Sequence, residues 1–255
     1  MGTPVAAHTT QAALQPRDAT LHGTVSLPAL CAYLQDAAAG HAAELGVAQT
    51  DLLDRHQSWV LVQLQVEATR LPRWTDTLGI ETWPSGLRGP FAQREFLLHV
   101  DDALVGRATS TWVVFDQKRR RPARPPRILH DLTLPDRPVA LAPREEEIVL
   151  PDRVDHQRHF RVRFHDLDLN AHVNNARYVA WALETLPLDW LQAHRAEGFT
   201  LDFKSETTAD MQVAATATCY AVPDTDKVRV VHHLADADAN TTLARAETHW
   251  IPIAG

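Results

Sequence analysis

The sequence has few cysteines and no long apolar run. Its 255 residues include two cysteines, Cys31 and Cys219, which are too few and too far apart for a disulfide scaffold or a CxxC zinc site. Both lie in apolar stretches, so we expect buried thiols with a structural role. No apolar stretch approaches the roughly 18 residues that a transmembrane helix requires. We therefore expect a protein that does not cross a membrane.

An excess of basic residues is also absent. The net charge of -7 argues against general nucleic-acid binding, which usually requires a basic surface. Hydrophobic residues make up 45% of the chain and charged residues 22%, an ordinary globular composition. The opening stretch MGTPVAAHTTQAALQPRD lacks the charged start and long apolar middle of a signal peptide, and it is not rich enough in arginine for a transit peptide. We predict a cytoplasmic protein.

The two halves of the chain repeat one order of features. GRATSTWVVF, at 106–115, and ARAETHWIPI, at 244–253, share an Arg-Ala pair and a tryptophan at the same spacing. LQVEATRLPRWTDTLGIET, starting at Leu64, and LDFKSETTADMQV, starting at Leu201, each combine a strand-like start, a polar break and an aspartate. A chain of this length suits about two domains. The sequence therefore indicates an internal duplication, with two copies of one structural unit.

Each half contains one long helix near its start. Ser26 is a suitable N-cap for an apolar helical pattern that begins at 27, and Gly46 suits the left-handed position after its end. In the second half, Asn174 or Asn175 precedes ARYVAWALETLP, where Pro187 stops the helix. We predict one central helix in each half.

Alternating apolar residues indicate strands with one buried face. The apolar positions are Leu64, Val66 and Ala68 in the first half and Phe160, Val162 and Phe164 in the second. The predicted fold class is α+β, with a curved antiparallel sheet wrapped around a long helix in each half. We place an N-terminal tail at 1–17, the first domain at 18–127, a Pro-rich and charge-rich linker at 128–156, and the second domain at 157–255.

The stretch FHDLDLNAHVNNARY, at 164–178, crowds carboxylates, amides and imidazoles just before the second helix. The corresponding stretch of the first half, LHGTVSLPALC at 21–31, contains His22 but no aspartate or asparagine. Because the two halves have similar folding requirements, the additional polar groups indicate a function located in the second half.

Two metal chemistries fit this stretch poorly. Asp166, Asp168 and Asn170 match the start of a calcium-binding EF-hand loop, but the turn glycine is Ala171 and the final ligand position is Arg177. A transition-metal site built from His165, Asp168 and His172 would have no standard ligand spacing. We therefore predict no metal.

Acid–base chemistry fits better. Asp168, Asn170 and His172 are spaced i, i+2, i+4, which in an extended segment places all three side chains on one side. The N-terminus of the following helix offers free N–H groups and a positive dipole end that stabilise an oxyanion. Together these groups can polarise a carbonyl and orient a water molecule.

The stretch HDLDLNAHVNNARYVAWALETLP closely resembles the signature of the fatty acyl-ACP thioesterases, which carry two hotdog domains. The resemblance covers most of the chain, because WVLVQLQVEATRLPRWTDTLGIETWPSG is similar to the N-terminal hotdog of that family and LDFKSETTADMQV to the strand that completes its active site. The resemblance implies two tandem hotdog domains. It also implies hydrolysis of a fatty acyl-ACP thioester, without a cofactor, to release a free fatty acid and end chain elongation.

The resemblance assigns the catalytic roles to Asp168, Asn170, His172 and Glu206. The next position is Thr207, where many plant members have cysteine, so we infer a carboxylate-and-water mechanism that needs no thiol. Asn170 and the helix N-terminal amides would polarise the carbonyl while Glu206, with His172, activates the water. Asp168 would orient the network. The sequence leaves open which of Asp168, His172 and Glu206 is the primary base, and whether Asp168 attacks directly.

Further residues are candidates for binding the substrate. They are Asn174 and Asn175 at the helix N-terminus, the aromatic residues Trp59, Trp83, Trp112 and Phe91 for the acyl pocket of the non-catalytic first half, and Arg119, Arg120 and Arg121. The basic run KRRRPARPPR, at 118–127, could meet the acidic acyl carrier protein and its phosphate-bearing arm. Ordinary core aromatics and a solvated connector are the equally simple alternatives.

Three alternative functions stay open. One is an acyl-CoA thioesterase, and another is a double-hotdog enoyl-thioester hydratase, which typically has proline after the asparagine where this chain has Ala171. The third is a silent acyl-thioester binding protein, which would not require all four polar residues. A serine hydrolase is unsupported because no GxSxG motif occurs. The sequence does not decide acyl chain length, the carrier, or whether the protein is a monomer or a homodimer.

Overall fold

A computed structural model describes residues 3–253 of the chain. The N-terminal half contains β1 (Thr3–Pro4), β2 (His8–Ala13), η1 (Pro16–Asp18), α1 (Leu27–Glu44), α2 (Gln49–Leu53), β3 (Gln57–Ala68), β4 (Thr77–Arg88), β5 (Phe91–Val100), β6 (Ala103–Asp116) and β7 (Arg121–Pro122). The connection holds α3 (Arg127–His130) and β8 (Leu132–Thr133). The C-terminal half contains β9 (His156–Arg161), η2 (Phe164–Asp166), α4 (Asn175–Glu184), α5 (Leu188–Ala193), β10 (His194–Phe203), β11 (Gln212–Ala221), β12 (Val228–Asp236) and β13 (Thr242–Pro252).

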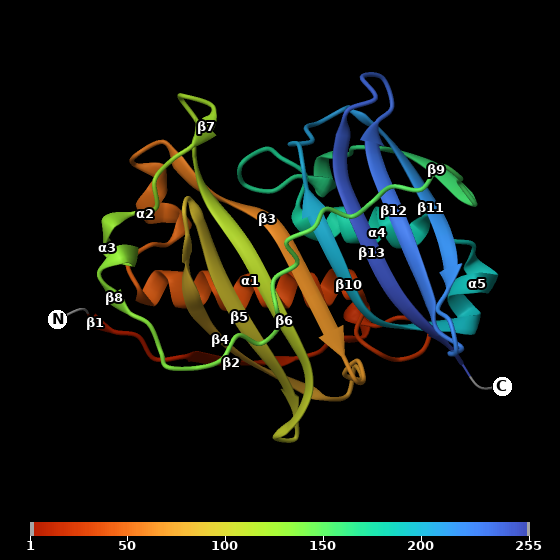
Figure 1. Cartoon of the computed structure of the whole chain (residues 1–255), viewed down its shortest axis with the longest axis horizontal. Helices are drawn as coiled ribbons and strands as arrows, with labels where there is room; N and C mark the ends of the chain where they lie inside the picture. The colour runs from red at the N-terminus through yellow and green to blue at the C-terminus, as the bar shows by residue number, and fades with distance from the viewer. Residues whose placement is uncertain (1–2, 254–255) are drawn as a thin grey trace.

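One 11-stranded antiparallel sheet runs through both halves. Its order is β2-β4-β5-β6-β3-β10-β13-β12-β11-β9, with β7 paired to β6. Figure 1 shows α1 crossing one face of the N-terminal strands and α4 crossing the same face of the C-terminal strands. The predicted α+β arrangement, in which each half wraps a curved sheet around one central helix, is therefore confirmed.

The local signals at the helix ends act as predicted. The Ser26 hydroxyl accepts a hydrogen bond from the Ala29 backbone N–H (3.3 Å) at the start of α1, and Gly46 follows its end with φ +68°. At the start of α4, the Asn174 side chain accepts from the Ala176 N–H (2.9 Å). Asn174, rather than Asn175, is therefore the N-cap.

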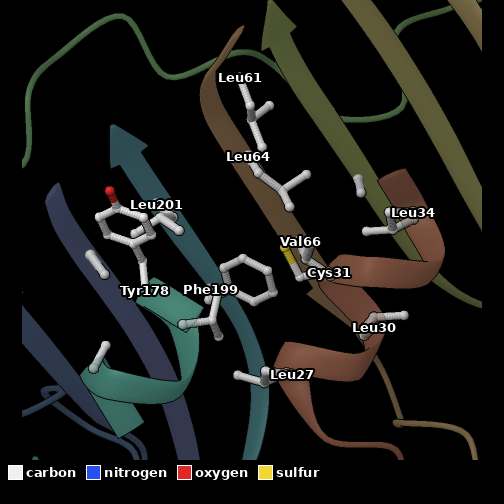
Figure 2. Close-up of a cluster of buried hydrophobic side chains, with 14 of the residues drawn as sticks. Leu27, Leu30, Cys31, Leu34, Leu61, Leu64, Val66, Tyr178, Phe199 and Leu201 are labelled. Atoms are coloured by element: carbon white, nitrogen blue, oxygen red, sulfur yellow. The ribbon is translucent and has the colours of Figure 1, made fainter. Parts of the chain in front are cut away.

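The two halves share one hydrophobic core because β3 and β10 are neighbours. Leu64 pairs with Leu201 in the ladder, and the Gln63 side chain donates to the Asp202 carboxylate (2.9 Å). Figure 2 shows residues of α1 and β3 meeting Tyr178 of α4 and residues of β10 in one cluster. Pairing within one chain thus joins the two units without a second chain.

The two cysteines lie at different depths. Cys31 is fully buried in α1, and burial raises the pKa of its thiol to about 12. Cys219 is partly buried in β11, and burial also raises the pKa of its thiol. Both thiols are therefore protonated near neutral pH and poor nucleophiles.

Two segments differ from the sequence-based expectation. The stretch 1–17, predicted as a tail, contains β2, which pairs with β4 from His8 to Ala13 and extends the N-terminal sheet. The strand predicted to run through Phe164 ends at Arg161 instead. Phe164 begins η2 with 82% of its surface exposed. The chain turns there because the buried Asp166 carboxylate accepts the Arg163 backbone N–H (2.9 Å).

The predicted linker 128–156 packs on the face of the sheet opposite the helices. Its Arg137 makes a double ion pair with Glu81 (2.6 and 2.9 Å) and lies over the Trp83 ring at 4.0 Å. Farther along, Arg144 reaches Glu247 of β13 (3.3 Å). Figure 1 shows this segment crossing from the N-terminal to the C-terminal half of the sheet. The linker is therefore part of the packed structure.

Glu247 provides a test of this packing. Burial alone would raise the pKa of its carboxyl, but the His249 hydrogen bond and the charges of Arg144 and Arg229 outweigh burial and lower the pKa from 4.5 to about 2. A carboxyl whose pKa is lower in the folded than in the unfolded protein stabilises the fold at pH values above its unfolded-state pKa. This contribution is lost as pH falls from about 4.5 towards 2. We expect Glu247→Gln to lower the free energy of unfolding on the order of 2 kcal/mol at pH 7.

Urea unfolding of both proteins between pH 7 and pH 3 measures this difference, which is expected to shrink below pH 4.5. Glu145→Gln is the matched control, since Glu145 follows Arg144 on the linker and its 81% exposed side chain pairs only with Arg88 among the described ion pairs. A pH-independent difference, or an equal effect of the control, would contradict the role given to Glu247.

Candidate active site

The polar stretch before α4 folds as a tight turn. An isolated bridge pairs Leu167 with Val173, and the Asp168 N–H donates to the His172 carbonyl (2.7 Å). Ala171 at the tip has φ +59°. The expectation of an extended segment is therefore wrong, because hydrogen bonds inside the turn bend the chain back on itself.

The Asp168 carboxylate holds this turn together. Its Oδ1 accepts the backbone N–H groups of Asn170 (2.8 Å) and His172 (3.3 Å), and its Oδ2 lies 3.4 Å from the Asn170 side-chain Nδ2. The structure thus brings Asp168, Asn170 and His172 together, by a different geometry from the one predicted. Asp168 is exposed to solvent, but both of its oxygens are used to shape the loop.

Glu206 approaches the turn from the segment after β10. Its Oε2 lies 3.6 Å from the His172 Nε2 and 3.3 Å from the Arg120 Nη2. The side chains of Glu206 and His172 are about one-third exposed, at 32% and 34%. A carboxylate and an imidazole at this distance, both reachable by water, can act together on one water molecule bound beside them. The four residues predicted as catalytic therefore form one cluster.

The N-terminal end of α4 is fixed beside the turn. The buried Asp166 pairs with Arg177 of α4 (3.3 Å), and its carbonyl accepts the Asn174 N–H (2.8 Å). The Asn174 side chain caps the helix, and the Asn175 side chain donates to Gln35 of α1 (2.6 Å). Both asparagine side chains, predicted to bind substrate, thus make structural hydrogen bonds, and the helix end remains as the electropositive element.

A buried pair of hydroxyl groups, from Tyr178 and Thr207, packs beneath the end of the turn that precedes α4 and helps to hold it in place. The Tyr178 hydroxyl donates to the Thr207 hydroxyl (2.7 Å), and the Thr207 carbonyl accepts the Val173 N–H (2.9 Å). Burial, together with the negative charges of Glu206 and Asp168, raises the pKa of Tyr178 to about 12, so the hydroxyl stays protonated at neutral pH. Thr207 is fully buried and fixes backbone positions on both sides of the site. Sequence reasoning missed Tyr178, which reads as an ordinary core aromatic.

The N-terminal half also reaches the turn. The Gln49 side-chain Nε2 lies 3.4 Å from the Asn170 Oδ1, and its Oε1 accepts the Trp59 backbone N–H (3.0 Å). The Trp59 indole in turn donates to the Val47 carbonyl (2.9 Å). Trp59, predicted to shape the acyl pocket, therefore lies close to the cluster. Sequence reasoning missed Gln49.

The other predicted aromatic residues lie elsewhere. Trp83 is on the opposite face of the sheet, beneath Arg137, so its predicted role in an acyl pocket is wrong. Leu78 and Ile80 occupy the inner face of β4, and Arg137 of the linker contacts Glu81 and Trp83 on the other face. Trp112 packs partly against the core, and Phe91 is 37% exposed at the start of β5.

The three predicted arginines lie at the exposed turn between β6 and β7. Arg120 has φ +49° and contacts Glu206, as described above. The Arg119 backbone N–H donates to Asp116 (2.9 Å), and Arg121 begins β7. This places a basic tip of the N-terminal half beside the cluster of the C-terminal half.

Among residues 3–253, no group of three or more His, Cys, Asp or Glu side chains is arranged to hold a metal ion. Over the same range, the helices lack the combined length and apolar character needed to cross a bilayer.

Comparisons with known proteins agree along the chain. The family model of the acyl-ACP thioesterase N-terminal domain matches residues 7–133, and that of the C-terminal domain matches residues 150–252. A dodecanoyl-[acyl-carrier-protein] hydrolase of Cinnamomum camphora is 29% identical over 245 residues, which are 90% of this chain and 63% of that protein. An oleoyl-acyl carrier protein thioesterase of Coriandrum sativum is 29% identical over 257 residues, covering 92% and 69% of the two chains. This chain thus spans about two thirds of the length of these relatives.

Solved structures show the same fold. The 12:0-ACP thioesterase from Umbellularia californica superposes with a TM-score of 0.85 at 24% identity, covering 97% of this chain and 94% of the other. An acyl-ACP thioesterase from Bacteroides thetaiotaomicron gives 0.81 at 21% identity, covering 96% and 97%. The predicted fold of two tandem hotdog domains is confirmed.

Proposed function

Because the chain belongs to the acyl-ACP thioesterase family, we propose that it hydrolyses the thioester of a fatty acyl-ACP and releases a free fatty acid. The observation that carries this proposal is that Asn170 and His172 share the turn held by Asp168, just before α4, with Glu206 3.6 Å from the His172 Nε2. The relatives named for acyl-ACP hydrolysis cover most of this chain, which supports the same substrate class. Cytoplasmic location stays a prediction.

In the proposed reaction, water attacks the thioester carbonyl carbon. The Glu206 carboxylate, with His172, takes a proton from the water as its oxygen forms the new C–O bond. The Asn170 Nδ2 and the N-terminal end of α4 stabilise the resulting oxyanion. When the C–S bond breaks, the departing thiolate receives the proton. The products are a fatty acid and the carrier thiol, so neither a protein thiol nor a cofactor is consumed.

The loop geometry favours Glu206 over Asp168 as the base. Both Asp168 oxygens face donors of the turn itself, so a direct attack by this carboxylate would break the loop that positions Asn170. The Glu206 carboxylate does not hold the turn together and instead faces His172 and Arg120. We therefore assign Asp168 an orienting role.

The turn also bears on the hydratase alternative. Ala171 has φ +59°, whereas the proline ring fixes φ near −65°. A proline after the asparagine, typical of the double-hotdog hydratases, cannot adopt this loop. The observed conformation therefore favours hydrolysis over hydration.

A thiol-release assay tests the proposed function. Acyl-ACP and acyl-CoA thioesters of several chain lengths are offered to the purified protein, and we expect the higher kcat/KM with acyl-ACP. A higher kcat/KM with acyl-CoA would identify the acyl-CoA alternative. Substrate binding without thiol release from any of these thioesters would support a silent binding protein and overturn the proposal.

Arg119 and Arg121 provide a test of carrier docking. We expect Arg119→Glu combined with Arg121→Glu to raise KM for acyl-ACP about tenfold at low salt, since charge complementarity acts mainly on encounter and is screened by salt. Arg120 is left in place because it contacts Glu206. Turnover of a short uncharged acyl thioester should not change. An unchanged KM for acyl-ACP would remove the docking role.

A further inference from the structure

Gln49 connects the N-terminal half to the candidate oxyanion donor. It is the first residue of α2, which follows the turn at Gly46, and it is partly buried. Its Oε1 accepts the Trp59 backbone N–H at 3.0 Å. A backbone N–H can only donate, so this contact fixes which end of the Gln49 amide is the oxygen. The Gln49 NH₂ group must therefore point the other way.

The NH₂ group of Gln49 points at Asn170. Its Nε2 lies 3.4 Å from the Asn170 Oδ1, which places the Asn170 NH₂ group on the side of Asp168. Reversing the Asn170 amide would set its NH₂ against that of Gln49 and its oxygen against the Asp168 carboxylate. The Trp59 N–H therefore fixes the orientation of the Gln49 amide, and the Gln49 amide in turn fixes that of Asn170.

We propose that Gln49 is a positioning residue that keeps the Asn170 NH₂ group turned towards the substrate carbonyl. This inference rests on the proposed thioester hydrolysis. One N–H of the Asn170 side chain faces Asp168, and the other would donate to the oxyanion. The first half, predicted to be non-catalytic, would then set the orientation of a catalytic group in the second half. Pre-orientation of a donor matters because it need not be rearranged as charge develops.

Gln49→Glu tests this role with almost no change in shape. Glutamate still accepts the Trp59 N–H, but its second oxygen cannot donate and would favour the reversed Asn170 amide. We expect kcat to fall about tenfold or more, with KM within about twofold and the melting temperature nearly unchanged, since loss of one oxyanion donor costs up to about a thousandfold. Gln157→Glu, an exposed glutamine on β9, is the control for added charge.

A double-mutant cycle separates positioning from a structural effect. If Gln49 acts through Asn170, Gln49→Glu should have no further effect in an Asn170→Ala background. Multiplied losses in the double variant, or a Gln49→Glu rate equal to that of the unchanged protein, would overturn the inference. Failure of the proposed function looks different, because the unchanged protein itself would then release no thiol from acyl-ACP or acyl-CoA.

Discussion

His172→Ala is expected to lower kcat for acyl-ACP at least about a hundredfold, the scale of lost acid–base catalysis. The His172 side chain is one-third exposed and contacts Glu206 across the site. Its removal should therefore leave the core and the melting temperature nearly unchanged. Initial rates of thiol release and thermal unfolding by circular dichroism measure the two effects separately.

Asp168→Ala is expected to cause a loss of similar size for a different reason. Without the carboxylate, the N–H groups of Asn170 and His172 lose the acceptor that holds the turn. Asp168→Asn keeps one acceptor oxygen and should recover part of the rate. If Asp168 were the nucleophile, the asparagine variant would be as inactive as the alanine variant. Near-normal hydrolysis by both His172→Ala and Asp168→Ala would contradict the assignment of this cluster as the active site.

Local signals in the sequence were sufficient to predict the two central helices, α1 and α4. Ser26, Gly46 and Asn174 act on their nearest neighbours in the chain, so their capping and turn preferences do not depend on distant contacts. The comparison of the two halves then indicated that strands of the same half wrap around each central helix, and the structure joins these strands into one sheet through β3 and β10. The family resemblance supplied Glu206, which no spacing rule connects to a loop more than thirty residues earlier.

Distant contacts explain what the sequence could not provide. The alternating pattern that ends at Phe164 continues past the last strand residue, and only the turn made by the buried Asp166 stops it. Trp83 was predicted to line the acyl pocket, but it lies on the outer face of β4, where Arg137 of the linker covers its ring. Gln49 and Asn170 lie 121 positions apart, so their contact has no signature in either local pattern.

The spacing of Asp168, Asn170 and His172 also has two structural solutions. An i, i+2, i+4 pattern suits one side of an extended segment, and it equally suits a turn in which the first side chain accepts the following N–H groups. The positive φ of Ala171 belongs to the second solution. Residue types were therefore enough to select this stretch as a candidate site, whereas its geometry required the fold.

Glu206→Gln is expected to lower kcat at least about a hundredfold, because an amide cannot take the proton of the attacking water. The change is nearly isosteric and keeps an oxygen towards Arg120. The exposed Arg120–Glu206 ion pair contributes little to stability, so the melting temperature should change little. Glu184→Gln, an exposed glutamate at the end of α4, is the matched control and should keep full activity.

Arg120 allows the role of Glu206 to be assigned more sharply. If Glu206 served only to hold Arg120 in place, Arg120→Gln and Glu206→Gln would break the same ion pair and cause equal losses. If Glu206 is the base, kcat of Glu206→Gln should be at least about tenfold lower than kcat of Arg120→Gln. Steady-state rates with saturating acyl-ACP compare the two variants directly. Equal modest losses would mean that His172 or Asp168 is the base instead. Asp168 could act as the base only if its hydrogen bonds to the N–H groups of Asn170 and His172 were broken.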